Sequence, residues 1–165
     1  MIGSKTYWQQ RFPGRPWWPG EIVNMSIGQG LVSASPLQIT RFMSTVATKG
    51  QMPKPYLVEY RRSNGKRTST RPSIQKVSMK STNMSVIHSS MLLAALPGGT
   101  AGEAGLYKRA GCPVDVAVKT GTAESSGFTD PQSGMKSMED SDHAWLAGFA
   151  PVQNPRIAFC FFGEN

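Results

Sequence analysis

The sequence of 165 residues lacks long apolar runs. No stretch approaches the roughly 18 to 20 consecutive apolar residues that a membrane-spanning helix requires. The first ten residues also lack the apolar centre of a signal peptide. We therefore expect neither a membrane anchor nor an export signal in this sequence.

Cysteine and histidine are equally scarce. Cys112 and Cys160 are the only cysteines, and they lie far apart, so we interpret them as two unpaired, mostly buried thiols. His88 and His143 are isolated from each other, and no spacing typical of metal ligands is present. We expect no metal and no other cofactor.

Acidic residues are scarce in the first two thirds of the chain. Residues 1–112 hold 15 Lys or Arg against 3 Asp or Glu, whereas residues 113–165 hold 3 against 7. A patch this basic suits nucleic acid, an anionic membrane or a cell wall. No zinc-ligand pattern, aromatic RNA-binding motif or helix-turn-helix signature accompanies it, so we predict no nucleic-acid binding. A steep salt dependence of DNA retention would support the opposite conclusion. The excess peaks in a run of cations with no acid between them: Arg61, Arg62, Lys66, Arg67, Arg71, Lys76 and Lys80.

Residues 1–23 are rich in Trp, Pro and Gly, a composition that disfavours regular structure. We predict an extended arm over residues 1–23 and a domain over residues 24–165. Ser35 and Pro36 predict the start of a helix at about 36–49 that Gly50 ends, and Asn64-Gly65 predicts a hairpin turn. Further expected elements are a strand at Tyr56–Tyr60, a helix at about 82–96 that buries Met84, Ile87, Met91, Leu92 and Ala95, and an antiparallel pair at 143–150 and 156–162. Pro97–Thr100 would end the second helix and open a flexible link. These elements predict an α+β fold, an antiparallel sheet flanked by helices.

The most informative stretch runs from Val114 to Ala123. An apolar, β-branched run leads directly into Lys119, Thr120, Gly121 and Thr122, so a buried strand would deliver an ammonium group and two hydroxyls to one end of a sheet. Gly121 has no side chain to keep a ligand from the backbone. Such donors suit a carboxylate that lies beside a polarised carbonyl.

Several separated motifs together resemble the C-terminal part of the transpeptidase domain of class B penicillin-binding proteins, most of all the elongation type, penicillin-binding protein 2. The similarity runs from about Trp17 to the C-terminus. The motifs are Ser26-Ile27-Gly28-Gln29-Gly30 with Ser35-Pro36-Leu37-Gln38, Gly98-Gly99-Thr100-Ala101, Val118-Lys119-Thr120-Gly121-Thr122-Ala123 and His143-Ala144-Trp145-Leu146-Ala147-Gly148-Phe149-Ala150-Pro151.

The resemblance implies part of a penicillin-binding serine transpeptidase (β-lactamase-like) fold, and an acyl-transfer enzyme that cross-links peptidoglycan stems ending in D-Ala-D-Ala and is acylated by β-lactams. It makes Lys119 a catalytic residue that supports the electrostatics of the site. Thr120, Gly121 and Thr122 become substrate-binding residues, with the Thr122 amide as half of the oxyanion hole, and Gln29 lines or braces the cleft. The resemblance also implies that the protein acts at the outer face of the cytoplasmic membrane.

The chain departs from the family in one respect. The family's Ser-x-x-Lys nucleophile and Ser-x-Asn motifs precede the segment that resembles Ile27–Gly30, and neither motif is found there. Ser-x-x-Lys occurs instead at Ser63–Lys66, Ser73–Lys76 and Ser133–Lys136, and Ser-x-Asn at Ser81–Asn83. We interpret these as chance matches, because none is predicted to place a serine at the start of a buried helix with its lysine one turn on.

Two functions follow. The first is a fragment of a peptidoglycan D,D-transpeptidase that lacks the acylated serine and is inactive alone, because no acyl-enzyme forms without a nucleophile. The second is a non-catalytic module that docks with a separately encoded N-terminal half, or with a cell-elongation complex, or that binds stem peptides weakly.

Overall fold

The computed structural model describes residues 5–11, 13–14, 16–18, 20–29, 33–71, 73–102, 111–123 and 142–164. The chain forms two compact units. Unit 1 comprises residues 1–35, 122–144 and 163–165, and unit 2 comprises residues 36–121 and 145–162. Among the described residues, no helix combines the length and the apolar character needed to cross a membrane.

In unit 1 the N-terminal segment contains two short helices, α1 (Lys5–Arg11) and α2 (Gly20–Ser26). The indole rings of Trp8, which is buried, and Trp17 meet edge to face with their centroids 5.6 Å apart. The expectation of an extended arm without regular structure was therefore wrong. The prolines of this segment lie between the two helices, and α1 contains neither Pro nor Gly. The residues that disfavour a helix are therefore concentrated between α1 and α2 and leave α1 free to form.

The first helix of unit 2, α3 (Pro36–Ala47), confirms the helix expected at about 36–49. It ends earlier than expected because Lys49 already has a positive φ of 56°. The Gly50 amide then donates to the Thr45 carbonyl at 2.8 Å, and Gly50 has a φ of 112°. A Cβ atom at Gly50 would lie 2.4 Å from the Val77 carbonyl oxygen, so only glycine fits this helix end.

The second long helix, α4 (Ser81–Ala95), confirms the helix expected at about 82–96. Its buried side chains are Met84, His88, Met91 and Ala95, one or two turns apart. Ile87, expected in the core, is exposed, and Leu92 is only half-buried. His88 takes the core position because its Nε2 lies 2.8 Å from the Val46 carbonyl and its ring packs 4.8 Å from that of Phe149.

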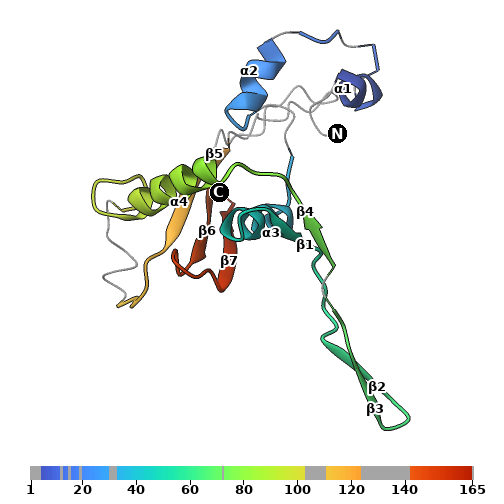
Figure 1. Cartoon of the computed structure of the whole chain (residues 1–165). Coiled ribbons are helices and arrows are strands. Elements are labelled where there is room, and N and C mark those ends of the chain that lie inside the picture. Colours follow the sequence, from blue (N-terminus) through green and yellow to red (C-terminus); the bar gives the residue numbers. More distant parts are fainter. Residues whose placement is uncertain are drawn as a thin grey trace. The chain divides into compact units, whose positions relative to one another are not determined.

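Between these helices unit 2 forms two small antiparallel sheets (Figure 1). Strand β1 (Gln51–Pro53) pairs with β4 (Ile74–Lys76), and β2 (Tyr60–Ser63) pairs with β3 (Lys66–Ser69). The strand expected at Tyr56–Tyr60 was wrong except for its last residue. The Asn64-Gly65 turn is confirmed, and both residues have the positive φ values (49° and 75°) that two-residue hairpin turns require.

The main sheet has the order β5–β6–β7, with β5 at Ala117–Ala123, β6 at His143–Ala150 and β7 at Ile157–Gly163. In unit 2, α3 and α4 pack on this sheet, which confirms the α+β class (Figure 1). The core cluster is built on Phe149, which is completely buried, and contains Met43, Val46, Ala47, Met91, Ala117, Ala147 and Phe149.

Both cysteines are free and of intermediate burial, so they are more exposed than the mostly buried thiols that we expected. Cys160 on β7 packs against the core cluster, and burial raises the pKa of its thiol because the thiolate loses solvation there.

Candidate functional site

Strand β5 runs from the core to the solvent. Ala117 and Val118 are buried, whereas Lys119 and Gly121 are exposed and Thr120 is half-buried. Because β5 is an outer strand of the β5–β6–β7 sheet, one of its edges is not paired within that sheet. The apolar start of the strand thus anchors it in the core, and the polar end presents its donors at a sheet edge.

The ammonium group of Lys119 folds back along the strand. Its Nζ donates a hydrogen bond to the carbonyl oxygen of Thr120 at 2.6 Å. A lysine ammonium has three donors, so this bond fixes the position of the charge and leaves donors for a bound anion. The positive charge therefore lies beside the backbone of the strand.

The hydroxyl of Thr120 has a partner far along the chain. It donates to the hydroxyl oxygen of Thr100 at 3.2 Å. Thr100 follows the last turn of α4, where the amides of Gly99 and Ala101 donate to the carbonyls of Leu96 and Ala94, each at 2.9 Å. These bonds form a compact turn that ends α4 as expected. Residues 103–110, most of the flexible link expected between this turn and Lys119, lie outside the described residues. Sequence reasoning missed Thr100 as a site residue, although it lies within one of the motifs noted above.

Gly121 provides space on the opposite side of the strand. A Cβ atom there would lie 3.3 Å from the Cβ of Trp145, which is closer than an ordinary contact. The Trp145 ring in turn packs against Phe162, with centroids 4.5 Å apart. A side chain at position 121 would therefore require Trp145 to move by a few tenths of an ångström.

In unit 1, the last part of β5 meets the segment that contains Gln29. The side-chain amide Nε2 of Gln29 donates to the carbonyl oxygen of Thr122 at 3.2 Å. This contact joins residues 93 positions apart and orients the peptide group that follows Thr122. The Thr122 side chain itself is exposed.

The chemistry of the polar end of β5 follows from its donors. An ammonium group, two threonine hydroxyls and the backbone amides of an outer strand all donate to anions. Residues 119–122 themselves contain no carboxylate that would repel an anion. The described carboxylates nearest to them in the sequence are Asp115 and Asp142. The strand end suits an anionic group better than a cation or an apolar ligand.

The Ser-x-x-Lys matches lie in quite different places. Ser63 and Lys66 are opposite each other across the hairpin turn, and both are exposed. Ser73 immediately precedes β4, and Lys76 is the last residue of that strand. In an extended strand, residues three apart point to opposite faces. The match at Ser133–Lys136 and the polar loop before Asp142 lie outside the described residues, whereas Ser81–Asn83 forms the first turn of α4.

Residues 4–163 match the family model of the penicillin-binding protein transpeptidase domain. The chain is similar to the peptidoglycan D,D-transpeptidase MrdA of Salmonella typhimurium (27% identical; 96% of this chain, 26% of the relative) and to penicillin-binding protein 2A of Bacillus subtilis (33%; 84% and 19%). It also resembles the imipenem acyl-enzyme structure of penicillin-binding protein A from M. tuberculosis (TM-score 0.66, 27% identical; 87% and 29%). The chain spans about a quarter of the length of the curated relatives it matches.

Proposed function

The chain belongs to the penicillin-binding protein transpeptidase family, and we propose that it supplies the Lys-Thr-Gly side of a peptidoglycan D,D-transpeptidase site. The substrate is a stem peptide that ends in D-Ala-D-Ala, and β-lactams occupy the same place. Penicillin-binding protein A, to which the chain is similar, forms an acyl-enzyme with imipenem. The reaction belongs at the cell envelope, on the outer face of the cytoplasmic membrane, where peptidoglycan is built.

In this proposal the end of β5 binds the terminal carboxylate of the substrate. The Thr122 hydroxyl donates to one carboxylate oxygen, and the Lys119 ammonium neutralises the charge. The Thr120 hydroxyl donates to the other oxygen when the Thr100 hydroxyl donates to Thr120 in return, since each hydroxyl has a single proton. The Thr122 amide donates to the scissile carbonyl oxygen, which becomes negative in the tetrahedral intermediate. Gln29 holds the Thr122 carbonyl and so fixes the peptide plane that follows it.

The chemical step requires a serine that attacks the carbonyl of the penultimate D-Ala. The serine oxygen forms an ester, the peptide bond breaks, and the terminal D-Ala leaves with a proton; the amine of a second stem then displaces the serine. No serine on the exposed β2–β3 hairpin is suited to this role, because a catalytic serine needs an adjacent base in a protected site. We assign the nucleophile to no residue of the described part of the chain.

The hydrogen bond from Thr120 to Thr100 is the observation that carries this proposal. It joins two family-like motifs that lie 20 residues apart, at the exposed end of a strand whose other end is buried. If the end of β5 had no binding role, there would be no reason for the turn after α4 to hold the Thr100 hydroxyl against the Thr120 hydroxyl.

Binding of a carboxylate peptide tests the proposal directly. A diacetyl-Lys-D-Ala-D-Ala peptide should shift the NMR amide signals of residues 119–122, and Lys119→Ala should weaken its binding about 10- to 100-fold, the loss expected for a hydrogen bond to a charged group. Lys54→Ala, which removes an exposed lysine elsewhere, is the matched control. The wild-type chain should bind the same peptide with an amidated C-terminus no more tightly than Lys119→Ala binds the peptide with a free carboxylate. Equal binding of acid and amide would contradict the proposal.

A fluorescent penicillin tests the assignment of the nucleophile. We expect no covalent label that survives denaturation of this chain on its own. A label that maps by mass spectrometry to Ser63 or Ser73 would overturn that assignment, and a label on Ser133 would contradict the expectation that this chain lacks the nucleophile. Either result would leave the role of Lys119 intact, so the two parts of the proposal fail separately.

A second candidate function is supported by exposed apolar side chains in unit 2. On α3 they include Leu37 and Phe42, on α4 Val86 and Leu93, and on β7 Phe161. Exposed apolar groups on several elements favour a docking partner. The partner would be a chain that carries Ser-x-x-Lys and Ser-x-Asn, or a cell-elongation complex. Co-purification with such a chain, lost in Phe42→Glu, would support docking, whereas a monodisperse monomer at high concentration would count against it.

A further inference from the structure

The β2–β3 hairpin carries a cluster of charge that the transpeptidase proposal does not use. All eight of its strand residues are exposed, so the hairpin contributes no side chain to the core. Its strands carry four cations, Arg61, Arg62, Lys66 and Arg67, and the sequence has no acid between Glu59 and Glu103. The hairpin therefore combines a high charge with an absence of packing.

The register shows that this charge is distributed over both faces. Arg61 pairs with Thr68 and Ser63 with Lys66, whereas Arg62 pairs with Arg67. Directly opposed residues share a face of a two-stranded ribbon, so one face carries Arg61 and Lys66 and the other carries Arg62 and Arg67. Like charges in directly opposed positions destabilise a hairpin. The Arg62–Arg67 pair is thus unfavourable for folding alone.

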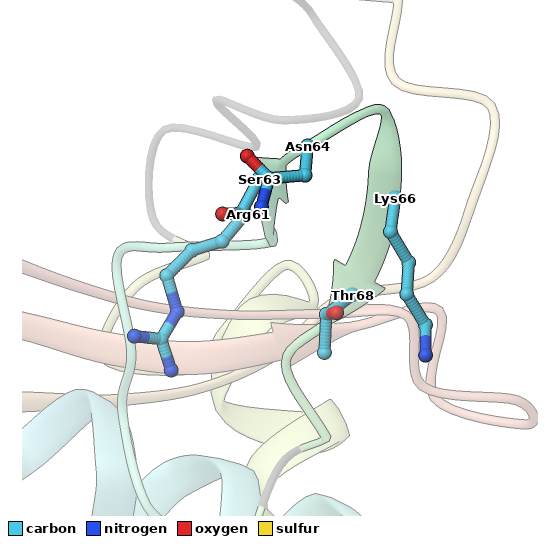
Figure 2. A pocket seen from close by; sticks show the side chains of 5 residues that line it. All are labelled: Arg61, Ser63, Asn64, Lys66 and Thr68. Carbon is cyan, nitrogen blue, oxygen red and sulfur yellow. The ribbon is translucent and has the colours of Figure 1, made fainter.

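The first face is hollowed and lined by donors. A concavity of about 510 Å³ is formed by Arg61, Ser63, Asn64, Lys66 and Thr68. In Figure 2, Thr68 lies between the side chains of Arg61 and Lys66, and Ser63 and Asn64 lie at the turn. Two cations with two hydroxyls and an amide are the groups that bind phosphate oxygens.

On the second face the aromatic ring of Tyr60 is already in contact with a cation of the hairpin itself. The guanidinium of Arg67 lies 4.0 Å from the centroid of the Tyr60 ring. Proteins that bind single-stranded nucleic acid stack bases on free aromatic rings. Residues 61–69 contain no aromatic residue, so the hairpin offers a base no free ring between Arg61 and Ser69. Nucleic acid therefore matches the hairpin less well than a polymer without bases.

From these observations we propose that the β2–β3 hairpin binds a flexible phosphodiester-linked polyanion that carries no bases. A bilayer surface is planar and engages one face of a ribbon, whereas a flexible chain can pass around it and neutralise both. Binding on both faces also relieves the repulsion between Arg62 and Arg67. This site is separate from the polar end of β5 and does not depend on the transpeptidase proposal.

Titration of the full chain with poly(glycerol phosphate) tests this site. Four neutralised cations predict that log K falls with log salt concentration with a slope of about −3. Replacing all four cations by Gln should weaken binding on the order of a hundred-fold at low salt. Because these side chains are exposed, the melting temperature should stay unchanged or rise. The absence of binding, or a salt slope unchanged in the quadruple variant, would overturn the proposal.

Paired variants separate the site from the net charge of the chain. Arg61→Gln/Lys66→Gln changes one face, Arg62→Gln/Arg67→Gln changes the other, and Lys54→Gln/Arg156→Gln removes the same charge outside the hairpin. We expect about a ten-fold loss of affinity for either hairpin pair and less than a two-fold loss for the control. An equal loss in all three would show binding by net charge only and overturn the proposal.

Two further ligands test the nature of the polyanion. Oligo(dT) with the same number of phosphates should bind no more tightly than poly(glycerol phosphate). Vesicles of phosphatidylcholine with 30% phosphatidylglycerol should retain less of the chain than the polymer at equal phosphate concentration. Tighter binding to oligo(dT), or vesicle binding that depends on one face alone and exceeds polymer binding, would replace this proposal by a nucleic-acid or membrane site.

Discussion

Strand β5 and the β2–β3 hairpin place polar side chains in opposite ways. β5 begins with two buried residues and ends with exposed donors, so the core determines where Lys119 and Thr120 lie. The hairpin has no buried residue in either strand, and only its register and turn determine where its cations lie. The first arrangement suits recognition of one small group at a fixed position. The second suits a ligand that is recognised by its charge density.

The largest difference between the two regions should appear in stability. Phe149→Ala empties the centre of the core behind β5 and should cost about 3–5 kcal/mol of unfolding free energy. Tyr60→Ala on the hairpin, where the side chain is 41% exposed, should cost less than about 1 kcal/mol. Urea denaturation measures both, and similar losses for the two variants would show that the hairpin is part of the core.

A glycine in each region gives a second comparison. In Gly148→Ala the new Cβ would lie 2.1 Å from the Ala117 carbonyl oxygen on β5, so the strand must shift, at a cost of about 1–3 kcal/mol. Gly65→Ala meets no neighbouring atom and is strained only by its φ of 75°. It should disorder the turn and leave the unfolding of the core unchanged. Hydrogen exchange of the β6 amides distinguishes the two, and protection equal to wild type in Gly148→Ala would contradict the packing argument.

Two threonine hydroxyls extend the comparison to binding. Thr120→Val removes the hydroxyl that meets Thr100 and should weaken the D-Ala-D-Ala peptide about 3- to 10-fold, which corresponds to about 1 kcal/mol for one neutral hydrogen bond. Thr68→Val, the matched change on the hairpin, should leave peptide binding unaltered. Isothermal titration of both variants checks this, and a loss in Thr68→Val alone would move the peptide site to the hairpin.

The smallest expected effect concerns Cys160. Burial raises the pKa of its thiol, so at pH 8 the reactive thiolate is a smaller fraction than in a free cysteine. In a Cys112→Ser background, iodoacetamide should alkylate Cys160 more slowly than a cysteine in a short peptide. The rate should continue to rise at pH values where the peptide has reached its plateau. Equal rates at pH 8 would contradict the shift.

The sequence was sufficient for those parts of the fold that depend on local patterns. Apolar periodicity predicted α3 and α4, and the Asn64-Gly65 pair predicted the hairpin because both positions need positive φ values. The β-branched run before Lys119 predicted that β5 starts in the core. The motifs that resemble the family led to the transpeptidase interpretation, which the match over residues 4–163 confirmed.

Features that depend on contacts distant in sequence could not be predicted in this way. His88 shares the apolar face of its helix with Met84 and Met91, but a polar side chain gives no sign of burial by itself. The partner that lets it lie in the core is the Val46 carbonyl, 42 residues away. Strands β1 and β4 are three residues each, too short to show a period. Thr100 belongs to the site because the turn after α4 brings its hydroxyl to that of Thr120 on β5. The residues next to Thr100 in the sequence do not indicate this contact.

The turn after α4 has a consequence for natural variation in this protein. Gly99 and Gly102 are packed so closely on the carbonyls of Leu93 and Leu96 that no side chain fits at either position. A substitution there would open the turn, withdraw Thr100 and release the Thr120 hydroxyl to rotate. If the proposed function holds, substitutions at these two glycines should alter β-lactam binding, as should substitutions in β5 itself.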